Sequence, residues 1–186
     1  MDEQLFKELR TCYAPIITNI INSNVKFFRF QETIKWQFNF DERVAIFACC
    51  DCKTNILTIN IGAVDFAFRI NEPLQIEYFL LHEIRHIYQH MEIADYKNNL
   101  SACNNPELAK KWADEEEKYV AAINKEGKEN AEYYKQDLEF DAFAFAYAVM
   151  KYKYGEVPYI SIPKAYGNEF SQIVDDWCKT FQKEHL

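Results

Sequence analysis

The length, composition and charge of this chain exclude several classes of protein. Its 186 residues include 49% hydrophobic and 16% aromatic side chains with only 4 Gly and 5 Pro, which excludes a disordered or low-complexity chain and predicts one folded domain. The formal net charge of -8 works against nucleic-acid binding, because that binding relies on Lys and Arg to neutralise phosphates.

The N-terminus and the apolar runs predict a protein of the cytoplasm. Residues 1–4 are acidic and lack the basic and then apolar pattern of an export signal. The apolar run at 143–150 is much shorter than the about 20 residues that cross a bilayer. The six cysteines are therefore interpreted as reduced thiols. Within Cys49-Cys50-Asp51-Cys52, buried small residues of a strand are favoured over a zinc site, since no second ligand pair follows.

The first part of the chain is expected to be a helix followed by a small sheet. Residues 1–24 carry Leu and Ile at helical spacing and predict a helical cap, with Pro15 at a break or in a first turn. Residues 25–70 hold short runs rich in Val, Ile, Phe and Thr, which predict strands at 25–30, 34–40, 44–49, 56–61 and 64–70. The connections, including a turn at 51–55, are too short for crossover helices, so a mostly antiparallel sheet is expected.

The rest of the chain is expected to be helical. Residues 71–153 are expected to form helices, and residues 154–186 a loop and a final helix. The apolar period and the positions of Asn and Pro predict the helices at about 72–95, 106–124, 129–153 and 168–183. The acidic run at 114–117 is interpreted as a solvated helix face. Strands followed by helices predict a single α+β domain over 1–186.

The segment His82-Glu83-Ile84-Arg85-His86 has the HExxH pattern of zinc peptidases. A helix turns once in about 3.6 residues, so His82 and His86 project from one face and can bind one zinc ion through their imidazoles. Glu83 lies beside them and can act as general base on a metal-bound water, then pass the proton to the leaving amine. The apolar residues at 78–81 predict a largely buried helix, where an unpaired His or Glu is costly. The alternative is a pair of surface histidines with a solvated Glu83.

The third zinc ligand is expected to come from another part of the chain. One class of zinc peptidase supplies it on the same stretch, in the pattern HExxHxxGxxH, but Gln89 and Glu92 stand at the positions of that Gly and His. Another class takes a Glu from a second helix. Glu139 and Asp141 lie in the very apolar helix expected at 129–153, where a carboxylate needs a partner or a metal. Glu139 is therefore the leading candidate.

The two segments His82-Glu83-x-x-His86 and Glu139-x-Asp141-Ala142-x-x-Phe145-Ala146 together resemble the ImmA/IrrE family of small gluzincin-like metallopeptidases. The usual form in that family is HExxH followed by ExEANxFA. The resemblance covers residues 40–150 and implies a zincin-like domain with Zn²⁺ held by His82, His86 and Glu139, and with Glu83 as general base. The chain departs from the family at Phe143, where Asn is usual, and at Arg85, where a small residue is usual. The charged helix at 106–124 is interpreted as an insertion.

Other polar side chains near the two motifs are expected to support the site. Arg85 is expected to pair with Asp141 or Glu77, or to bind a peptide carboxylate, and Asp141 to accept a hydrogen bond from a ligand histidine. His90 is favoured as a solvent-facing histidine over a spare ligand, and His185 is given no role. A tyrosine is expected to stabilise the developing oxyanion, and the sequence does not choose among Tyr88, Tyr133, Tyr134 and Tyr147.

These patterns favour a cytoplasmic zinc metalloendopeptidase that acts on a protein or peptide substrate, with no direct nucleic-acid or membrane partner. The edge strand of a hairpin at 56–70 is expected to hold the extended substrate by backbone pairing. The family resemblance implies a regulated role, such as cleavage of a repressor. Two alternatives stay open: a metallopeptidase-like interaction module that keeps zinc but hydrolyses nothing, and a secreted effector protease. The substrate, the cleavage specificity and the oligomeric state are left open.

Overall fold

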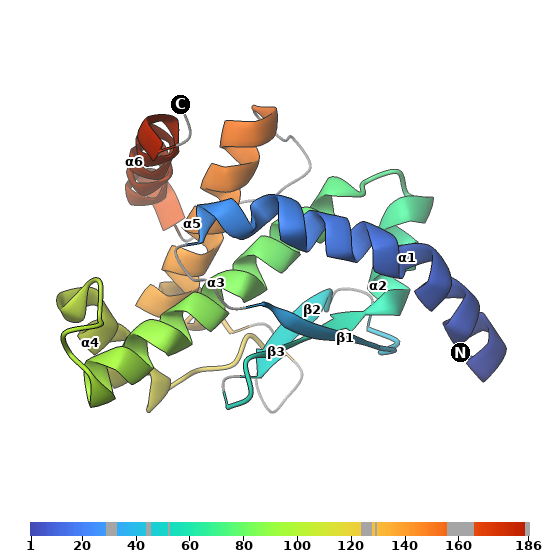
Figure 1. Ribbon diagram of the computed structural model, residues 1–186, viewed down its shortest axis with the longest axis horizontal. Coiled ribbons are helices and arrows are strands. Elements are labelled where there is room, and N and C mark those ends of the chain that lie inside the picture. Colours follow the sequence, from blue (N-terminus) through green and yellow to red (C-terminus); the bar gives the residue numbers. More distant parts are fainter. Residues whose placement is uncertain are drawn as a thin grey trace. The chain divides into compact units, whose positions relative to one another are not determined.

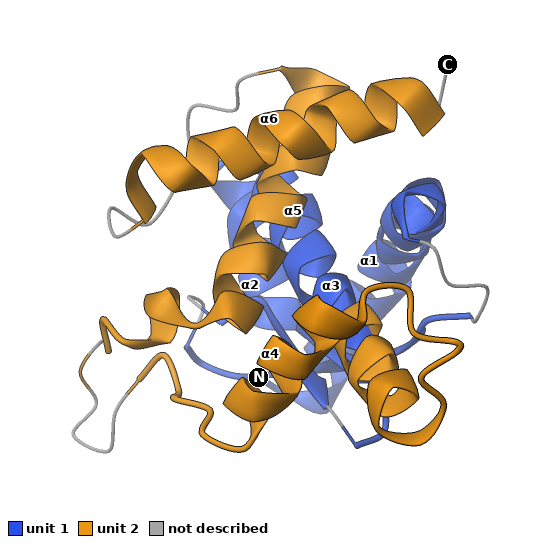
Figure 2. Cartoon of the chain, turned by 90° about the vertical axis from the view of Figure 1, so that its left-hand side faces the viewer, with its two compact units in different colours: residues 1–87 blue, residues 88–186 orange. Residues whose placement is uncertain are grey.

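A computed structural model describes residues 1–28, 33–43, 46–51, 53–123, 128, 130–155 and 166–184 of the chain. Contacts divide the chain into two compact units, Met1–Ile87 and Tyr88–Leu186, which Figure 2 colours separately. The first unit holds the N-terminal helix and the sheet, and the second is helical. The expected α+β class is confirmed. None of the helices described is long and apolar enough to cross a membrane.

The chain begins with one long helix, α1, over Glu3–Asn24 (Figure 1). The carboxylate of Asp2 caps it by accepting a hydrogen bond of 2.7 Å from the backbone N–H of Leu5. Pro15 lies inside α1 and not at the expected break. The helix packs on the rest of the first unit through Tyr13, whose ring stacks on that of Phe68 with 5.2 Å between centroids. A short 3-10 turn, η1, follows at Val25–Phe27, where a strand was expected.

Three strands form the sheet: β1 (Lys35–Asn39), β2 (Ala48–Asp51) and β3 (Ile56–Asn60). Their order is β1-β3-β2, and Figure 1 shows them side by side. The expected turn at 51–55 joins β2 to β3 as an antiparallel hairpin. On the other edge of β3, β1 pairs with it in the parallel direction. The sheet is therefore mixed rather than mostly antiparallel.

The expected strand at 64–70 is wrong, because residues Ile61–Arg69 form a helix, α2. Asn60 starts this helix by accepting a hydrogen bond of 3.1 Å from the N–H of Gly62 through its side-chain oxygen. The residues of α2 that are 0% exposed are Ile61, Ala63, Val64 and Ala67, and their spacings of three and four residues suit one face of a helix. The hairpin expected over 56–70 therefore does not exist.

Four long helices complete the chain: α3 (Leu74–Asn98), α4 (Pro106–Glu116), α5 (Asp137–Tyr154) and α6 (Gly167–Glu184). Helix α3 begins in the first unit and continues into the second. Helix α4 ends before the expected residue 124, and α5 begins later than the expected 129, after a 3-10 turn, η2, at Tyr133–Lys135. Most of the loop expected at 154–167, with Val44, Cys52 and His185, lies outside the described residues.

The core of the second unit explains the apolar run of α5. Ala142, Ala144, Ala146 and Ala148 are 0% exposed, so small side chains let other elements approach α5 closely. Phe145 packs edge-on against Trp177 of α6 at 5.1 Å between ring centroids, and against Phe181 at 5.7 Å. The first turn of α5, which carries Glu139, is thereby part of a well-packed helix.

Candidate metal centre

Helix α3 places the two histidines of the HExxH segment on one face. Leu80, Leu81 and Ile84 are at most 1% exposed and hold this stretch of the helix in the core. The Nε2 atoms of His82 and His86 are 3.1 Å apart, and the rings lie nearly perpendicular at 87°. Two ligand nitrogens of a tetrahedral zinc ion, each about 2.0–2.1 Å from the metal, stand roughly 3.3 Å apart. The two rings therefore already point their donor atoms at one shared position.

Glu139 lies in the first turn of α5 and is 0% exposed. Its Oε1 accepts a hydrogen bond of 2.7 Å from the hydroxyl of Tyr119, in the segment after α4. The start of α5 is held from α4, since the carboxylate of Glu115 accepts bonds of 2.8 and 2.9 Å from the N–H groups of Asp137 and Leu138. Glu115 was expected only on a solvated face, and it instead caps the helix that carries Glu139.

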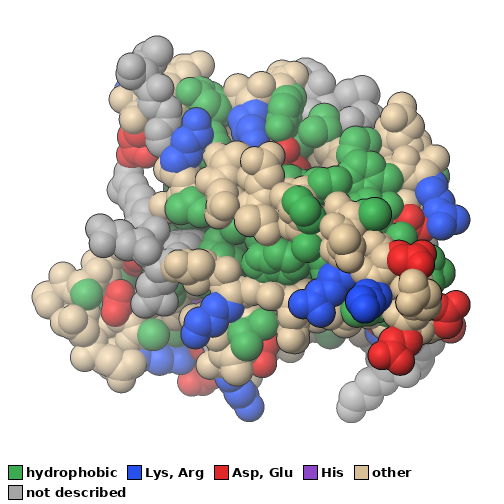
Figure 3. Space-filling model, turned by 45° about the vertical axis from the view of Figure 1, so that its right-hand side comes forward, with side chains coloured by type: hydrophobic (Ala, Val, Ile, Leu, Met, Phe, Trp, Pro, Cys, Tyr) green, Lys and Arg blue, Asp and Glu red, His purple; other side chains and the backbone are tan. Residues whose placement is uncertain are grey.

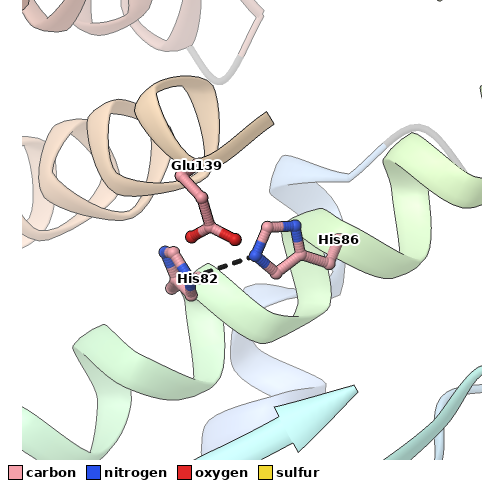
Figure 4. A group of neighbouring side chains, drawn as sticks. All are labelled: His82, His86 and Glu139. Carbon is pink, nitrogen blue, oxygen red and sulfur yellow. Dashed lines mark hydrogen bonds between the residues drawn. The ribbon is translucent and has the colours of Figure 1, made fainter. Parts of the chain in front are cut away.

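His82, His86 and Glu139 form a group that could hold a metal ion (Figure 4). One ligand atom from each residue lies within 4.8 Å of the other two. Two imidazoles and one carboxylate are the protein ligands of one class of catalytic zinc site, which keeps a further position open. The donor set therefore fits zinc. In the described ranges, no other trio of His, Cys, Asp or Glu meets the same distance criterion.

Glu83 is oriented by the edge strand β2. Its Oε2 accepts a hydrogen bond of 2.8 Å from the backbone N–H of Cys50, and its Oε1 lies 4.0 Å from Nε2 of His82. The side chain is 15% exposed, so water reaches it although it is half-buried. One carboxylate oxygen is thus anchored to the strand while the other lies near His82. This arrangement suits a general base, because it orients the second oxygen of the carboxylate.

The cysteines of β2 lie beside this carboxylate. Loss of hydration, followed by the charges of Glu83 and Asp51, raises the pKa of the Cys49 thiol. A thiol must lose its proton before it binds zinc, so Cys49 is a poor competitor of the histidines. The interpretation of Cys49 as a buried small residue is wrong, because the residue as a whole is exposed and its thiol is only partly shielded from water.

Gln89 and Asp141 join α3 to α5 in the second unit. The amide of Gln89 donates one hydrogen bond of 2.8 Å to Oδ2 of Asp141 and another of 2.9 Å to the carbonyl of Leu138. Gln89 is fully buried, and its bond to the carbonyl of Leu138 is shielded from water, whereas Asp141 is half-buried. Asp141 therefore has a defined partner on α3, and its expected contact with a ligand histidine stays a prediction.

Arg85 is buried at 4% exposure, one residue before His86. Of the two carboxylates expected to pair with it, Glu77 accepts a hydrogen bond of 2.7 Å from the side chain of Asn24. Burial at this depth is unusual for an arginine and is compatible with a role that braces the helix of the site. The pairing of Arg85 stays a prediction.

Glu92 has a structural role. It is 3% exposed and accepts hydrogen bonds from the side-chain amide of Asn104, from the backbone N–H groups of Asn104 and Asn105, at 2.8 and 3.3 Å, and from the Cys103 thiol, at 3.4 Å. Burial opposes its ionisation, but these bonds outweigh burial and lower the pKa of the Glu92 carboxyl. Glu92 thus holds the loop before α4.

The sequence patterns did not single out Tyr119, Cys50 or Glu115. Tyr119 is 49% exposed and belongs to no periodic apolar face, and Cys50 acts through its backbone. Of the tyrosines named from the sequence, Tyr133 packs edge-on against Tyr119 at 6.4 Å between ring centroids. Tyr147 packs on Phe170 of α6. No signal within a single helix or strand could have identified these contacts.

Comparison of the whole chain with family models, with curated proteins and with solved structures finds no match in any of the three.

Proposed function

We propose that this protein is a zinc-dependent metallopeptidase of the ImmA/IrrE type that hydrolyses peptide bonds of a protein substrate. The observation that carries the proposal is the group of His82, His86 and Glu139, with Glu83 oriented beside it. The donor set suits zinc, and a carboxylate next to such a set is the usual base of a hydrolytic site. Reduced thiols at Cys12 and Cys103 support the cytoplasm as its place of action.

Each residue has a distinct role in this proposal. Zinc, when bound, would polarise the scissile carbonyl and make a water molecule more acidic. His82, His86 and Glu139 would hold it, and the hydrogen bond from Tyr119 would keep the Glu139 carboxylate in place. Glu83 would take a proton from water through Oε1 and deliver it to the leaving amine nitrogen, while the Cys50 N–H holds its Oε2.

The strand that would hold an extended substrate is β2. The expected edge strand within 56–70 is excluded by α2, whereas β2 is an edge of the sheet and directs the Cys50 N–H towards Glu83. A substrate segment paired along β2 would bring its backbone to the carboxylate. Cys49, an exposed residue, would then face that segment or the surrounding water.

A non-hydrolytic zinc-binding module is the second candidate. The hydrogen bond from Cys50 to Glu83 favours it, because this bond ties one oxygen of the carboxylate to β2. The two candidates differ in what Glu83 does and agree on the three ligands.

Proteolysis by the wild type and by Glu83→Gln separates these candidates. The purified zinc-loaded chains are incubated with a cell lysate, and new protein N-termini are identified by mass spectrometry. A peptidase yields N-termini that are absent with Glu83→Gln, although this variant keeps its zinc. Zinc-loaded wild type that produces no such termini supports the non-hydrolytic module.

A further inference from the structure

A second feature of the first unit lies between α1 and β1. A cavity of 460 Å³ is lined by Phe6, Arg10 and Ala14 of α1 and by Trp36, Gln37 and Phe38 of β1, and these six residues define the α1–β1 groove. The helix residues follow one another every four positions and so form one stripe. The volume falls within the range of ligand sites, about 300–1,000 Å³.

Among the residues that the structure describes, the contacts that anchor α1 lie in its later part. Tyr13 stacks on Phe68 and donates a hydrogen bond of 2.9 Å to Asp65 of α2, and Ile17 and Ile21 are buried. The first turns of α1 carry Leu5 at 39% exposure and Phe6 half-buried. Figure 3 brings forward the side on which α1 begins, and hydrophobic side chains lie there beside both basic and acidic ones.

The strand that lines the groove has an open edge. In the order β1-β3-β2, β1 is terminal, and β3 is its partner among the strands that the structure describes. Such an edge leaves backbone N–H and C=O groups available to another strand. Trp36 and Phe38 pack edge-on at 5.2 Å between ring centroids and remain half-buried. An open edge beside an aromatic surface can receive an extended peptide.

Arg10 gives the groove a positive charge. It is exposed, and its side chain makes no ion pair or hydrogen bond with any residue in the described ranges. Two other exposed arginines that the structure describes in this unit differ, since Arg43 pairs with Asp41 at 2.5 Å and Arg69 with Asp65 at 2.8 Å. A guanidinium without a partner among the described residues, beside three aromatic rings, is suited to an acidic group.

We propose that the α1–β1 groove binds an extended, acidic segment of a partner protein. The segment adds to the open edge of β1, packs apolar side chains against Phe6, Trp36 and Phe38, and places an Asp or Glu on Arg10. A second copy of this chain fits less well, because β1 itself reads Lys35-Trp36-Gln37-Phe38-Asn39 and offers no carboxylate to Arg10. The proposal does not depend on zinc or on hydrolysis.

Selection from a random dodecapeptide library displayed on phage, with the full chain as bait, tests this proposal. The enriched peptides are expected to alternate apolar residues and to contain Asp or Glu. The best one, synthesised with a fluorescent label, is expected to lose about tenfold in affinity for Arg10→Glu, measured by anisotropy. Lys7→Glu is the matched control, since Lys7 is exposed on α1 outside the groove, and affinity there should stay within about twofold.

Backbone methylation separates strand addition from simple apolar binding. Methyl groups on the nitrogens of the peptide edge that pairs with β1 are expected to abolish binding, because they remove its N–H donors. Methyl groups on the opposite edge should leave binding unchanged. Absence of enriched peptides overturns the proposal, as does binding that Arg10→Glu and Trp36→Ala leave intact. The proposal is also overturned if the wild type sediments as a dimer and Arg10→Glu as a monomer. In that case a second copy of this chain occupies the groove. Glu83→Gln should bind the peptide with wild-type affinity, because Glu83 does not line the groove. Peptide binding therefore tests the groove independently of the proposed hydrolysis.

Discussion

The hydroxyl of Tyr119 donates a hydrogen bond of 2.7 Å to Oε1 of Glu139, whose side chain is completely buried. Tyr119 lies twenty residues before Glu139, in a segment outside α4 and α5. A donor to one oxygen of a carboxylate restricts its rotation and directs the other oxygen. The contact therefore links the conformation of the segment after α4 to the candidate ligand.

Removal of this hydroxyl tests the link. Tyr119→Phe is expected to weaken zinc binding about tenfold, because Glu139 loses the donor that orients it, while the ring remains in place. Competition with a chromophoric chelator measures the affinity. Tyr96→Phe is the matched control, as Tyr96 is a partly buried tyrosine packed on the core around Ile93. Equal zinc affinity of Tyr119→Phe and the wild type would refute the role of the hydroxyl.

The zinc content of purified variants tests the ligand set. The wild type is expected to carry close to one zinc ion per chain, and His82→Ala or Glu139→Ala to lose most of it, because two remaining ligands hold zinc weakly. Inductively coupled plasma mass spectrometry after gel filtration gives the ratio. His90→Ala, one turn further along α3, should keep its zinc. Full retention by Glu139→Ala would remove Glu139 from the set, and Asp141 would be tested next.

Glu92→Gln tests the charge that holds the loop before α4. The pKa of Glu92 is lowered below its usual 4.5 in the folded chain, so the carboxylate stabilises the fold above that pH, and this contribution is lost as the pH falls through the lowered value. The variant is expected to be less stable at pH 7 by about 2 kcal/mol. Urea unfolding between pH 7 and pH 3 should show the difference narrowing below about pH 4.5.

The exposed Glu117 provides the control for this measurement. Glu117→Gln should leave the free energy of unfolding unchanged within about 0.5 kcal/mol at each pH. If the free energies of unfolding of the wild type and Glu92→Gln differ by the same amount from pH 7 to pH 3, the shape of the Glu92 side chain matters and its charge does not.

Asn60 organises the loop between β1 and β2 as well as the start of α2. Its side-chain oxygen accepts from the N–H groups of Asp41 and Gly62, each at 3.1 Å. Its amide donates to the carbonyls of Asp41, Arg43 and Ile46, at 3.1, 3.3 and 2.9 Å. The residue is 2% exposed, so loss of the side chain leaves several backbone groups poorly paired.

Asn60→Ala is expected to lower the free energy of unfolding by about 3 kcal/mol, measured by urea denaturation. Asn60→Asp is the sharper variant, since it keeps the cap of α2 but sets a carboxylate against three carbonyls. It should be at least as unstable as Asn60→Ala. The exposed Asn39 is the control site, and Asn39→Ala should change little. Wild-type stability of Asn60→Asp would mean that the three carbonyl contacts contribute nothing.

Several local features were correct from the sequence because they depend on spacing within one element. The interval of four residues between His82 and His86 predicts that both rings share a helix face, and their Nε2 atoms lie 3.1 Å apart. The turn between β2 and β3 was also predicted correctly, from its Asp, Lys, Thr and Asn. The α+β class followed from the change of hydrophobic period along the chain.

One error in the predicted secondary structure arose at a short apolar run that suits either a strand or a helix. Residues 61–69 are rich enough in Val, Phe and Ile for a strand, yet Asn60 caps them as a helix whose small residues are buried. The direction of β1 was missed for a different reason. A pairing between strands that are not consecutive depends on which edge of β3 remains open after the hairpin forms.

By itself, the sequence determined the residues of the HExxH segment, their common helix face and the carboxylates available on the later helix, since these follow from helical repeat and residue chemistry. The tertiary structure decided the rest: that the Cys50 N–H orients Glu83, that Tyr119 holds Glu139, and that Glu115 caps α5. These contacts join residues far apart in the chain. They depend on how whole elements pack, which the spacing of residues along one element does not encode.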